Sequence, residues 1–416
     1  MAAVLASAEG RLRQLRRLWA KEGAAGILWR LRKRAARTLI PPGSVELPIG
    51  DAEFEAAAEL ARSGWRLPPP APWQEGDPLR VAWVCTPPTP GSGGHTTMFR
   101  LADALVAAGH HSTVYLMDRH EGEFSRHLER VHTGWPTLRS EVRDMADGIA
   151  DCHAVFATGW ESAWTLLGTS ALGLRCYLVQ DFEPSFYPAG SEYLLAEATY
   201  RFGFQGVTAG TWLPTVLEAY GMEAKSFDFG CDLATYHLSA SPTARDGICY
   251  YCRPSTPRRA HELALAGLKL FARRNPGTPI HFYGERVGEP GFAVHQHGNL
   301  SPEQLNALYN DCAAGLVLSA TNVSLVPHEM LASGCTPVVN DAAQNRLVLA
   351  NDHVAYTEAT PHDIASRLEQ LVRAPVAAKQ ATARELAASV SGRTWTAVGL
   401  DFVGTVRELV RAAQPR

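Results

Sequence analysis

The sequence contains no long apolar run. None of its stretches approaches the roughly 18 apolar residues that a membrane-spanning helix needs, so no transmembrane helix is expected. No cleavage pattern follows the short first apolar stretch, so no secretory signal is predicted. The eight cysteines are scattered, mostly inside apolar runs, which indicates reduced core residues of a cytoplasmic protein. Cys249 and Cys252 form a lone CxxC without a second pair, which favours strand residues over a zinc or redox site.

The net charge of −3 hides an asymmetry along the chain. The segment from Arg11 to Arg37 holds 10 Lys and Arg residues against one acid, Glu22. The remainder has 29 basic and 41 acidic residues, a net charge of −12. This acidic body argues against a nucleic-acid-binding surface, and the 416-residue length predicts roughly two or three domains.

Residues 1–40 are predicted to form helix. Leu12, Leu15, Leu18 and Trp19 recur at helical spacing while arginines fill the other face, which indicates contact with an anionic membrane surface. A helical arm packed on its own body or on a partner subunit is the alternative. The Pro-rich segment 41–78 is predicted to be an extended linker along the surface, so residues 1–78 form an arm and a linker.

Residues 79–240 are predicted to form a first α/β domain. Strands are expected at 79–84, 113–117, 155–158, 175–179 and 206–209, and a helix at 96–108. The glycine-rich loop 91–94 lacks the spacing of a dinucleotide fingerprint, so NAD binding is not indicated. Its glycines at a helix N-terminus would let a ligand approach the backbone, although a simple tight turn is equally compatible.

A second distinctive stretch is Leu178 to Phe204. Gln180 ends a strand, and Asp181 and Glu183 follow in a loop with Phe182, Phe186 and Tyr187. Carboxylates hold hydroxyl groups and aromatic faces pack on sugar C–H surface, so this loop is a candidate sugar subsite. The alternative is a polar loop in which Asp181 caps the backbone.

Residues 241–392 are predicted to form a second α/β domain, with strands at 247–252, 279–283 and 294–297. Arg253 and Arg259 lie six residues apart around a turn between a strand and an amphipathic helix. This arrangement is typical of phosphate binding, because guanidinium groups form bidentate contacts with phosphate oxygens. Surface arginines at a helix start are the alternative.

Residues 315–341, GLVLSATNVSLVPHEMLASGCTPVVND, read as strand, loop, helix and strand. A buried strand is predicted at 316–318, a short helix from Pro327 to Gly334, and a strand at 337–339. The loop lies outside the carboxyl end of a strand, where open α/β sheets bind ligands. Glu329, one turn into the helix, is placed to accept hydrogen bonds from sugar hydroxyls. Further helices are expected at 362–372, 377–390 and 395–412.

Segments 178–204 and 315–341 resemble retaining GT-B glycosyltransferases of glycosyltransferase family 4. The stretches QDFEPSFYP and TNVSLVPHEMLASGC are similar to the WsaF-type rhamnosyltransferases within that group, and the resemblance extends over roughly residues 79–412. The family carries two glutamates separated by seven residues. The second is Glu329 here, whereas the first, which contacts the transferred sugar in the family, falls on Thr321, so this sequence departs from the family there.

The resemblance implies two Rossmann-like domains facing one another across a cleft. It also implies transfer of a sugar, L-rhamnose from dTDP-L-rhamnose, with retention of configuration and without a metal, onto a growing cell-surface polysaccharide or lipid-linked glycan. The terminal segment 393–416 would cross back to the first domain. Arg253 and Arg259 match the pair that grips the donor diphosphate, and Gln180 falls where many members carry a histidine near the sugar. Donor contacts are implied at Gly93, Gly94, His95, Tyr283, Gly284, Asn322, Ser324, Leu325, Val326 and Glu329.

Two other functions stay open at this stage. One is a transferase that uses a UDP or GDP sugar, which the substitution at Thr321 allows. The other is a catalytically silent GT-B module that binds glycan or organises a membrane assembly through its basic arm. A protein–DNA role ranks below both, because the acidic body offers no matching surface.

Overall fold

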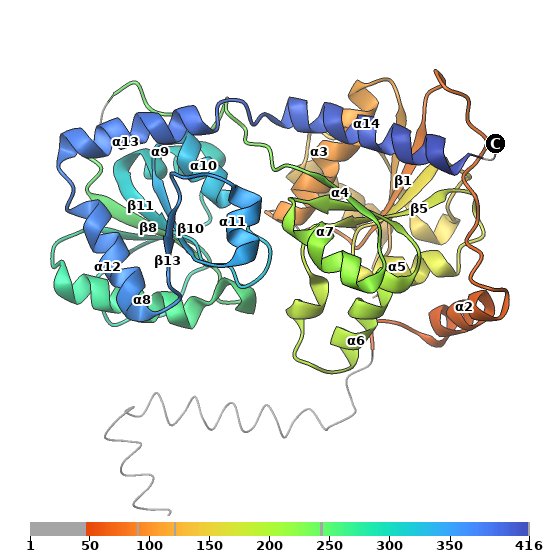
Figure 1. The fold of residues 1–416 in the computed structure, drawn as a ribbon, viewed down its shortest axis with the longest axis horizontal. Coiled ribbons are helices and arrows are strands. Elements are labelled where there is room, and N and C mark those ends of the chain that lie inside the picture. Colours follow the sequence, from red (N-terminus) through yellow and green to blue (C-terminus); the bar gives the residue numbers. More distant parts are fainter. Residues whose placement is uncertain (1–46, 90, 120–121, 242–243, 415–416) are drawn as a thin grey trace, which may run out of the picture. The chain divides into compact units, whose positions relative to one another are not determined.

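The structure is a computed structural model that describes residues 47–89, 91–119, 122–241 and 244–414 (Figure 1). The helix predicted over residues 1–40, and with it the predicted membrane contact of residues 11–37, lies outside the described residues. Two parallel sheets with flanking helices organise residues 51–414. We call residues 80–227 with the terminal helix the first-sheet domain, and residues 247–389 the second-sheet domain.

The first sheet has seven parallel strands in the order β3-β2-β1-β4-β5-β6-β7. The order reverses between β1 and β4, which are hydrogen-bonded neighbours, and such a switch point is where open α/β sheets bind ligands. The strands are β1 Arg80–Cys85, β2 His111–Leu116, β3 Glu141–Asp144, β4 Ala154–Ala157, β5 Leu174–Val179, β6 Gln205–Ala209 and β7 Ala224–Phe227.

The second sheet has six parallel strands in the order β10-β9-β8-β11-β12-β13. Its switch point lies between β8 and β11, so the loops that follow these two strands leave the sheet side by side. The strands are β8 Gly247–Cys252, β9 Ile280–Gly284, β10 His295–Gly298, β11 Cys312–Leu316, β12 Thr336–Asn340 and β13 Ala355–Thr357.

Helices flank both sheets. Their ends follow local signals: Ser301 accepts a hydrogen bond from the Gln304 N–H in a capping box, and Ser92 and Thr360 cap two others. The helices are α2 Asp51–Arg62, α3 Gly93–Ala107, α4 Phe124–Gly134, α5 Trp160–Leu167, α6 Ser191–Ala198, α7 Trp212–Leu217, α8 His261–Arg274, α9 Pro302–Asp311, α10 Val326–Ala332, α11 Ala343–Leu349, α12 Pro361–Val372, α13 Val376–Ser389 and α14 Trp395–Ala413.

The structure corrects two predictions of local structure and adds two strands that were not predicted. The supposed extended linker contains helix α2, because residues 51–62 carry no proline and consist largely of Ala, Glu and Leu, which are strong helix formers. The strand expected at 316–318 begins earlier, at Cys312, directly after α9. The edge strands β3 and β7 were not predicted, because both are short and half-polar.

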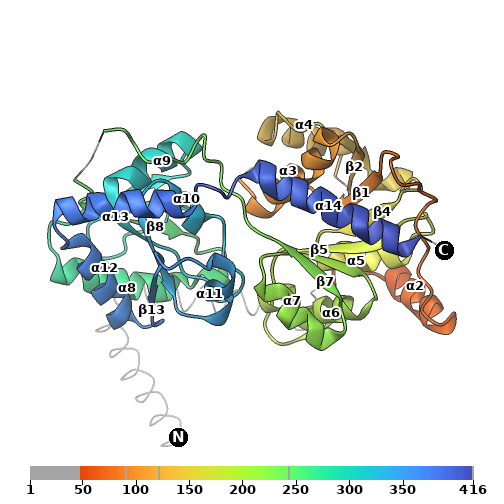
Figure 2. The ribbon, with the colours of Figure 1, turned by 45° about the horizontal axis from the view of Figure 1, so that its top comes forward.

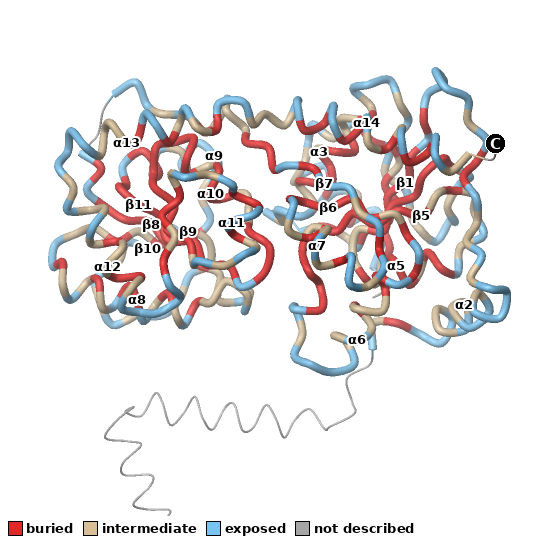
Figure 3. The backbone as a smooth tube through the Cα atoms, in the orientation of Figure 1, coloured by how far each residue is buried: buried red, intermediate tan, exposed pale blue. Residues whose placement is uncertain are grey.

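The interior of each domain is built from the strands and the inner helix faces (Figure 3). In the first-sheet domain Trp83 stacks on Phe156, with ring centroids 4.6 Å apart, and Phe402 of α14 packs against both rings. Helix α14 runs along α3 in both views of the ribbon (Figures 1 and 2). The last helix is therefore part of the first-sheet core.

All eight cysteines are buried and unpaired, which confirms their predicted place in the core. Within the described ranges, no helix is long and apolar enough to cross a membrane. No group of three or more His, Cys, Asp or Glu side chains in the described part of the chain has the geometry to hold a metal ion.

Candidate functional site

A loop of the second-sheet domain meets the first-sheet domain through Asn322. The Asn322 side-chain amide donates to the carbonyl oxygens of Gln180 and Ala209, both at 2.8 Å, at the carboxyl ends of β5 and β6. Its backbone N–H donates to Asp181 Oδ1 at 2.9 Å. Asn322 is almost fully buried. One side chain thus joins the loop after β11 to the carboxyl end of the first sheet.

Asp181 is the centre of the same junction. Its Oδ2 accepts a hydrogen bond from the Thr321 hydroxyl at 3.0 Å and lies 3.1 Å from Arg258 Nε in an ion pair. Its Oδ1 also accepts from the Phe182 N–H. Burial raises the pKa of this carboxyl, and the positive charge of Arg258 opposes the rise. Asp181 is therefore saturated by protein contacts, and Thr321, where the family has a glutamate, is one of its partners.

Glu183 lies in the interior of the first-sheet domain. Its two carboxylate oxygens accept hydrogen bonds from the Trp160 N–H at 2.7 Å and from the Tyr177 hydroxyl at 3.0 Å. Only 6% of the residue is exposed, and burial raises its pKa to about 8. The structure thus places Glu183 behind the junction, where it joins β5 to the start of α5.

The start of α3 lies beside Gln180. Gln180 Nε2 donates to the Gly94 carbonyl oxygen at 3.0 Å, so two predicted site positions are brought together. His95 is held from both sides of its ring, by Ser92 Oγ at 2.8 Å and by the Thr86 carbonyl oxygen at 3.2 Å. Gly93 is exposed in the first turn, and burial lowers the pKa of His95.

The arginine-bearing loop between β8 and α8 contacts both neighbouring loops. Arg259 Nη1 donates to Ser319 Oγ at 2.6 Å and to the Asn322 carbonyl oxygen at 3.3 Å. These two partners are neutral, so no direct ion pair with a described residue neutralises the guanidinium charge. Arg258 pairs instead with Asp181 and covers the Phe186 ring at 4.2 Å.

Arg253 stands at the opposite end of that loop. Its Nε lies 3.3 Å from Glu285 Oε1, and its side chain is one-third exposed. Glu285 also accepts hydrogen bonds from the backbone N–H and the hydroxyl of Ser255, so it fixes the start of the loop. Gly284 precedes it with a φ of +99°, and a Cβ there would lie 2.6 Å from the Cys252 carbonyl oxygen. Glycine is therefore needed where β9 ends beside Arg253.

Tyr283 points into the core of the second-sheet domain. Its ring stacks on Tyr251, and its hydroxyl accepts a hydrogen bond from the Tyr309 hydroxyl at 3.0 Å. Burial raises its pKa well above the ordinary value. Its side chain thus supports the sheet beneath the site.

Glu329 lies in the first turn of α10, next to Ser324, Leu325 and Val326. Its side chain is half-buried, and it has no hydrogen bond or ion pair from its carboxylate to any described residue. Burial raises its pKa to about 7, an effect that Arg100 opposes and Asp232 reinforces. The Ser324 hydroxyl is also buried, with no hydrogen-bond partner in the described part of the chain. Unlike Asp181, this part of the site keeps free hydrogen-bonding capacity.

Sequence reasoning missed two cations. Arg258 was not among the predicted site residues, although it carries the ion pair to the first-sheet domain. Arg100 was not considered, because a single arginine inside a helix carries no motif. Only the packing of α3 brings it close enough to act on Glu329.

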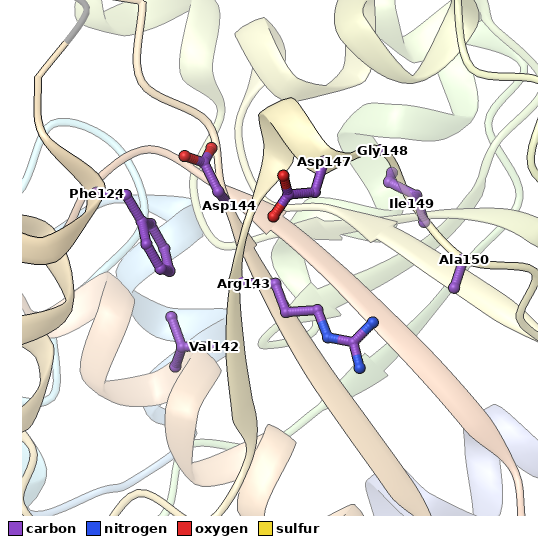
Figure 4. A pocket seen from close by; sticks show the side chains of 8 residues that line it. All are labelled: Phe124, Val142, Arg143, Asp144, Asp147, Gly148, Ile149 and Ala150. Atoms are coloured by element: carbon purple, nitrogen blue, oxygen red, sulfur yellow. The ribbon is translucent and has the colours of Figure 1, made fainter.

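A separate hollow of about 490 Å³ lies at the β3 edge of the first sheet (Figure 4). Phe124, Asp144 and Asp147 are among its lining residues. None of the predicted site residues lines it. The two carboxylates and the exposed Arg143 around it form a polar surface apart from the junction.

Comparison with known proteins shows a similarity in sequence and in fold. Residues 156–209 match the WsaF N-terminal domain, and residues 246–369 match the WsaF C-terminal domain. The O-antigen biosynthesis protein RfbC of Myxococcus xanthus is 36% identical over 234 residues, which is 53% of this chain and 18% of that protein. This chain therefore covers less than a fifth of the length of that relative.

Solved structures share the two-domain architecture. HepE of Anabaena, solved with UDP-glucose, has a TM-score of 0.60 at 13% sequence identity, covering 79% of this chain and 100% of that one. TarM of S. aureus has a TM-score of 0.66 at 8% identity, covering 80% and 99%. The predicted GT-B fold is thereby confirmed, and the two matched segments are similar to the N- and C-terminal domains of WsaF.

Proposed function

We propose that this chain transfers a sugar from a nucleoside-diphosphate donor to a growing polysaccharide. The observation that carries the proposal is that Arg259 and Glu329 lie on the two loops at the switch point of the second sheet, and that neither has an ion pair with a described residue. A guanidinium without a counter-ion favours a phosphate, and a free carboxylate favours hydroxyl groups. A nucleotide sugar offers both.

The chemistry follows from the charges. In a retaining transfer the bond from the sugar to the diphosphate breaks, a bond to the acceptor oxygen forms, and the departing phosphate takes the acceptor's proton. No protein base is required in this scheme. Negative charge grows on the diphosphate, and Arg253 and Arg259 would stabilise it in place of a metal ion; one such preorganised contact is worth about 3 kcal/mol.

The buried acidic residues have a supporting role in this proposal. Asp181 orders the loop that carries Thr321 and Asn322, and Glu183 holds the end of β5. Gln180 reaches the first turn of α3. Direct contact of any of the three with the transferred sugar stays a prediction.

The donor we favour is dTDP-L-rhamnose, because of the similarity to the WsaF type in segments 178–204 and 315–341. A UDP sugar is the second candidate, because HepE, which shares the fold, was solved with UDP-glucose. The name of the RfbC relative supports O-antigen or another cell-surface polysaccharide as the product. A cytoplasmic location, with residues 11–37 on an anionic membrane, completes the proposal.

Donor binding tests the proposal directly. Calorimetry of the purified chain against dTDP-rhamnose, dTDP, UDP-glucose and a GDP sugar, without added metal, should give preferential dTDP binding that Arg253→Ala weakens. A preference for UDP-glucose would replace the donor and keep the mechanism. Absence of binding by the folded chain to every donor would overturn the transferase proposal in favour of a silent glycan-binding module.

A further inference from the structure

The carboxylate of Glu329 lies in surroundings that disfavour its charge. Asp232 adds negative charge from the segment that crosses between the domains, and Cys231 and Tyr236 face it from the same segment. Tyr283 of β9 and Tyr309 of α9 are further titratable groups in its surroundings. Among the described residues, Arg100 of α3 is the cation whose charge acts in the opposite direction.

Arg100 is fixed by helix packing and not by an anion. It has no hydrogen bond or ion pair to a described residue, and its guanidinium lies 4.7 Å from the centroid of the Trp395 ring. One turn further along both helices, a Cβ on Gly399 would lie 2.7 Å from Ala104 Cβ. Helices α3 and α14 therefore pack closely in a fixed register. This packing holds the Arg100 guanidinium over the Trp395 indole.

The indole in turn lies against the crossing segment. A Cβ on Gly230 would lie 2.7 Å from the Trp395 ring, so this approach requires a glycine. The Cys231 N–H donates to the Arg393 carbonyl oxygen at 2.7 Å, and Cys231 Sγ lies 3.8 Å from the His328 carbonyl oxygen. His328 immediately precedes Glu329. A continuous set of contacts thus connects α3 to the start of α10.

We propose that Arg100 is a positioning residue for Glu329: from the first-sheet domain, it keeps the Glu329 carboxylate in its charged, hydroxyl-accepting form when the two domains are assembled. The two groups are more than hydrogen-bond distance apart, so the interaction is long-range attraction, which a partly buried site screens less than water does. The inference rests on the proposed function only where it assigns ligand binding to Glu329.

The test is a double-mutant cycle in which stability is measured as a function of pH. Unfolding of the wild type, Arg100→Gln, Glu329→Gln and the double variant is measured between pH 5 and 8.5. Burial raises the folded pKa of Glu329 to about 7, above its unfolded value near 4.5, so protonation favours the folded state. The contribution of Glu329 to the stability of the folded state is therefore largest at low pH and is lost as pH rises towards 7.

Removing Arg100 should raise the pKa of Glu329 in the folded state further. The loss of stability with rising pH should therefore continue above pH 7. We expect the folding equilibrium constant of Arg100→Gln to fall relative to that of the wild type only above pH 7. The fall should be about tenfold for each unit by which the pKa of Glu329 rises. Glu329→Gln should abolish this fall, and Arg100→Lys should keep the wild-type profile. The exposed Arg143→Gln is the matched control and should leave the profile unchanged.

A second readout separates this inference from the proposed function. If the site binds a nucleotide sugar, Arg100→Gln should move the acid limb of the affinity–pH curve to higher pH. If the coupling between Arg100 and Glu329 depends on pH but the wild type binds no donor, the positioning role is upheld and the transferase proposal is overturned. Two outcomes would overturn the inference. One is donor binding by the wild type together with an equal loss of stability in Arg100→Gln at pH 5 and 8.5. The other is a fall in stability above pH 7 that Arg100→Gln still causes in the Glu329→Gln background.

Discussion

Two polar clusters of this protein lie on neighbouring loops and differ in how their charges are satisfied. Around Asp181, each carboxylate oxygen has two partners, and Asn322 uses its amide for two carbonyl oxygens. Around Glu329, the carboxylate and Arg100 lack direct partners among the described residues. A saturated cluster is suited to holding the domains together, whereas an unsatisfied one keeps its capacity for a ligand.

The largest effect should come from the saturated cluster. Asp181→Ala leaves Arg258 without its ion pair and removes the acceptor of Thr321 and of the Asn322 N–H. Because a partly buried charge and two buried hydrogen-bond donors then lack their partner, we expect the free energy of unfolding to fall by about 3–5 kcal/mol. Chemical denaturation measures it, with the exposed Asp401→Ala as control. A loss as small as that of the control would show that the junction is not a stabilising contact.

Asn322→Ala should have the next largest effect. The carbonyl oxygens of Gln180 and Ala209 lose their donors in a buried position. Since each unsatisfied group costs about 1–3 kcal/mol, a loss of about 2–4 kcal/mol in unfolding free energy is expected. Exposed Asn299→Ala is the matched control. An unchanged denaturation midpoint would mean that water replaces the amide without cost.

Arg253→Ala should separate binding from stability. Its side chain is one-third exposed and pairs with Glu285, so we expect unfolding free energy to change by less than about 0.5 kcal/mol. Loss of charge-assisted contacts to a diphosphate should cost about 1.5–3 kcal/mol, or roughly a 10- to 150-fold weaker Kd. Calorimetry with the preferred donor measures this change, and Arg143→Ala serves as control. Equal affinities of the two variants would remove Arg253 from the site.

The last prediction concerns the slope of stability with pH. Burial raises the folded pKa of Glu183 to about 8, above the unfolded value of 4.5, so the folded state binds the proton more tightly. Its contribution to stability is present at low pH and should decline between pH 4.5 and 8, by at most about 1.4 kcal/mol per pH unit. Glu183→Gln should flatten this part of the unfolding–pH curve, whereas exposed Glu218→Gln should not. If the unfolding free energy of Glu183→Gln keeps the same pH dependence, that dependence comes from another titratable group.

Local patterns located most of the sheet. The strands at 247–252 and 337–339, the Ser301 cap and the terminal helix could be read from the sequence, because apolar runs and capping residues act over a few neighbouring positions. Short half-polar strands such as β3 and β7 could not, since pairing at a sheet edge, not their own composition, makes them strands. Helix α2 was hidden by the prolines on either side of it.

The sequence by itself determined which chemistry is available: Arg253 and Arg259 around one turn, Glu329 in the first turn of a helix, and two acids after β5. Only the tertiary structure decided which of these charges are satisfied. Asp181 and Glu183 look alike in the sequence as neighbouring acids of one loop, yet both are saturated by partners up to 141 residues away, while Glu329 is not. The physical reason is that hydrogen-bond saturation depends on which distant groups the packed sheets bring within about 3 Å, and no local pattern encodes that distance.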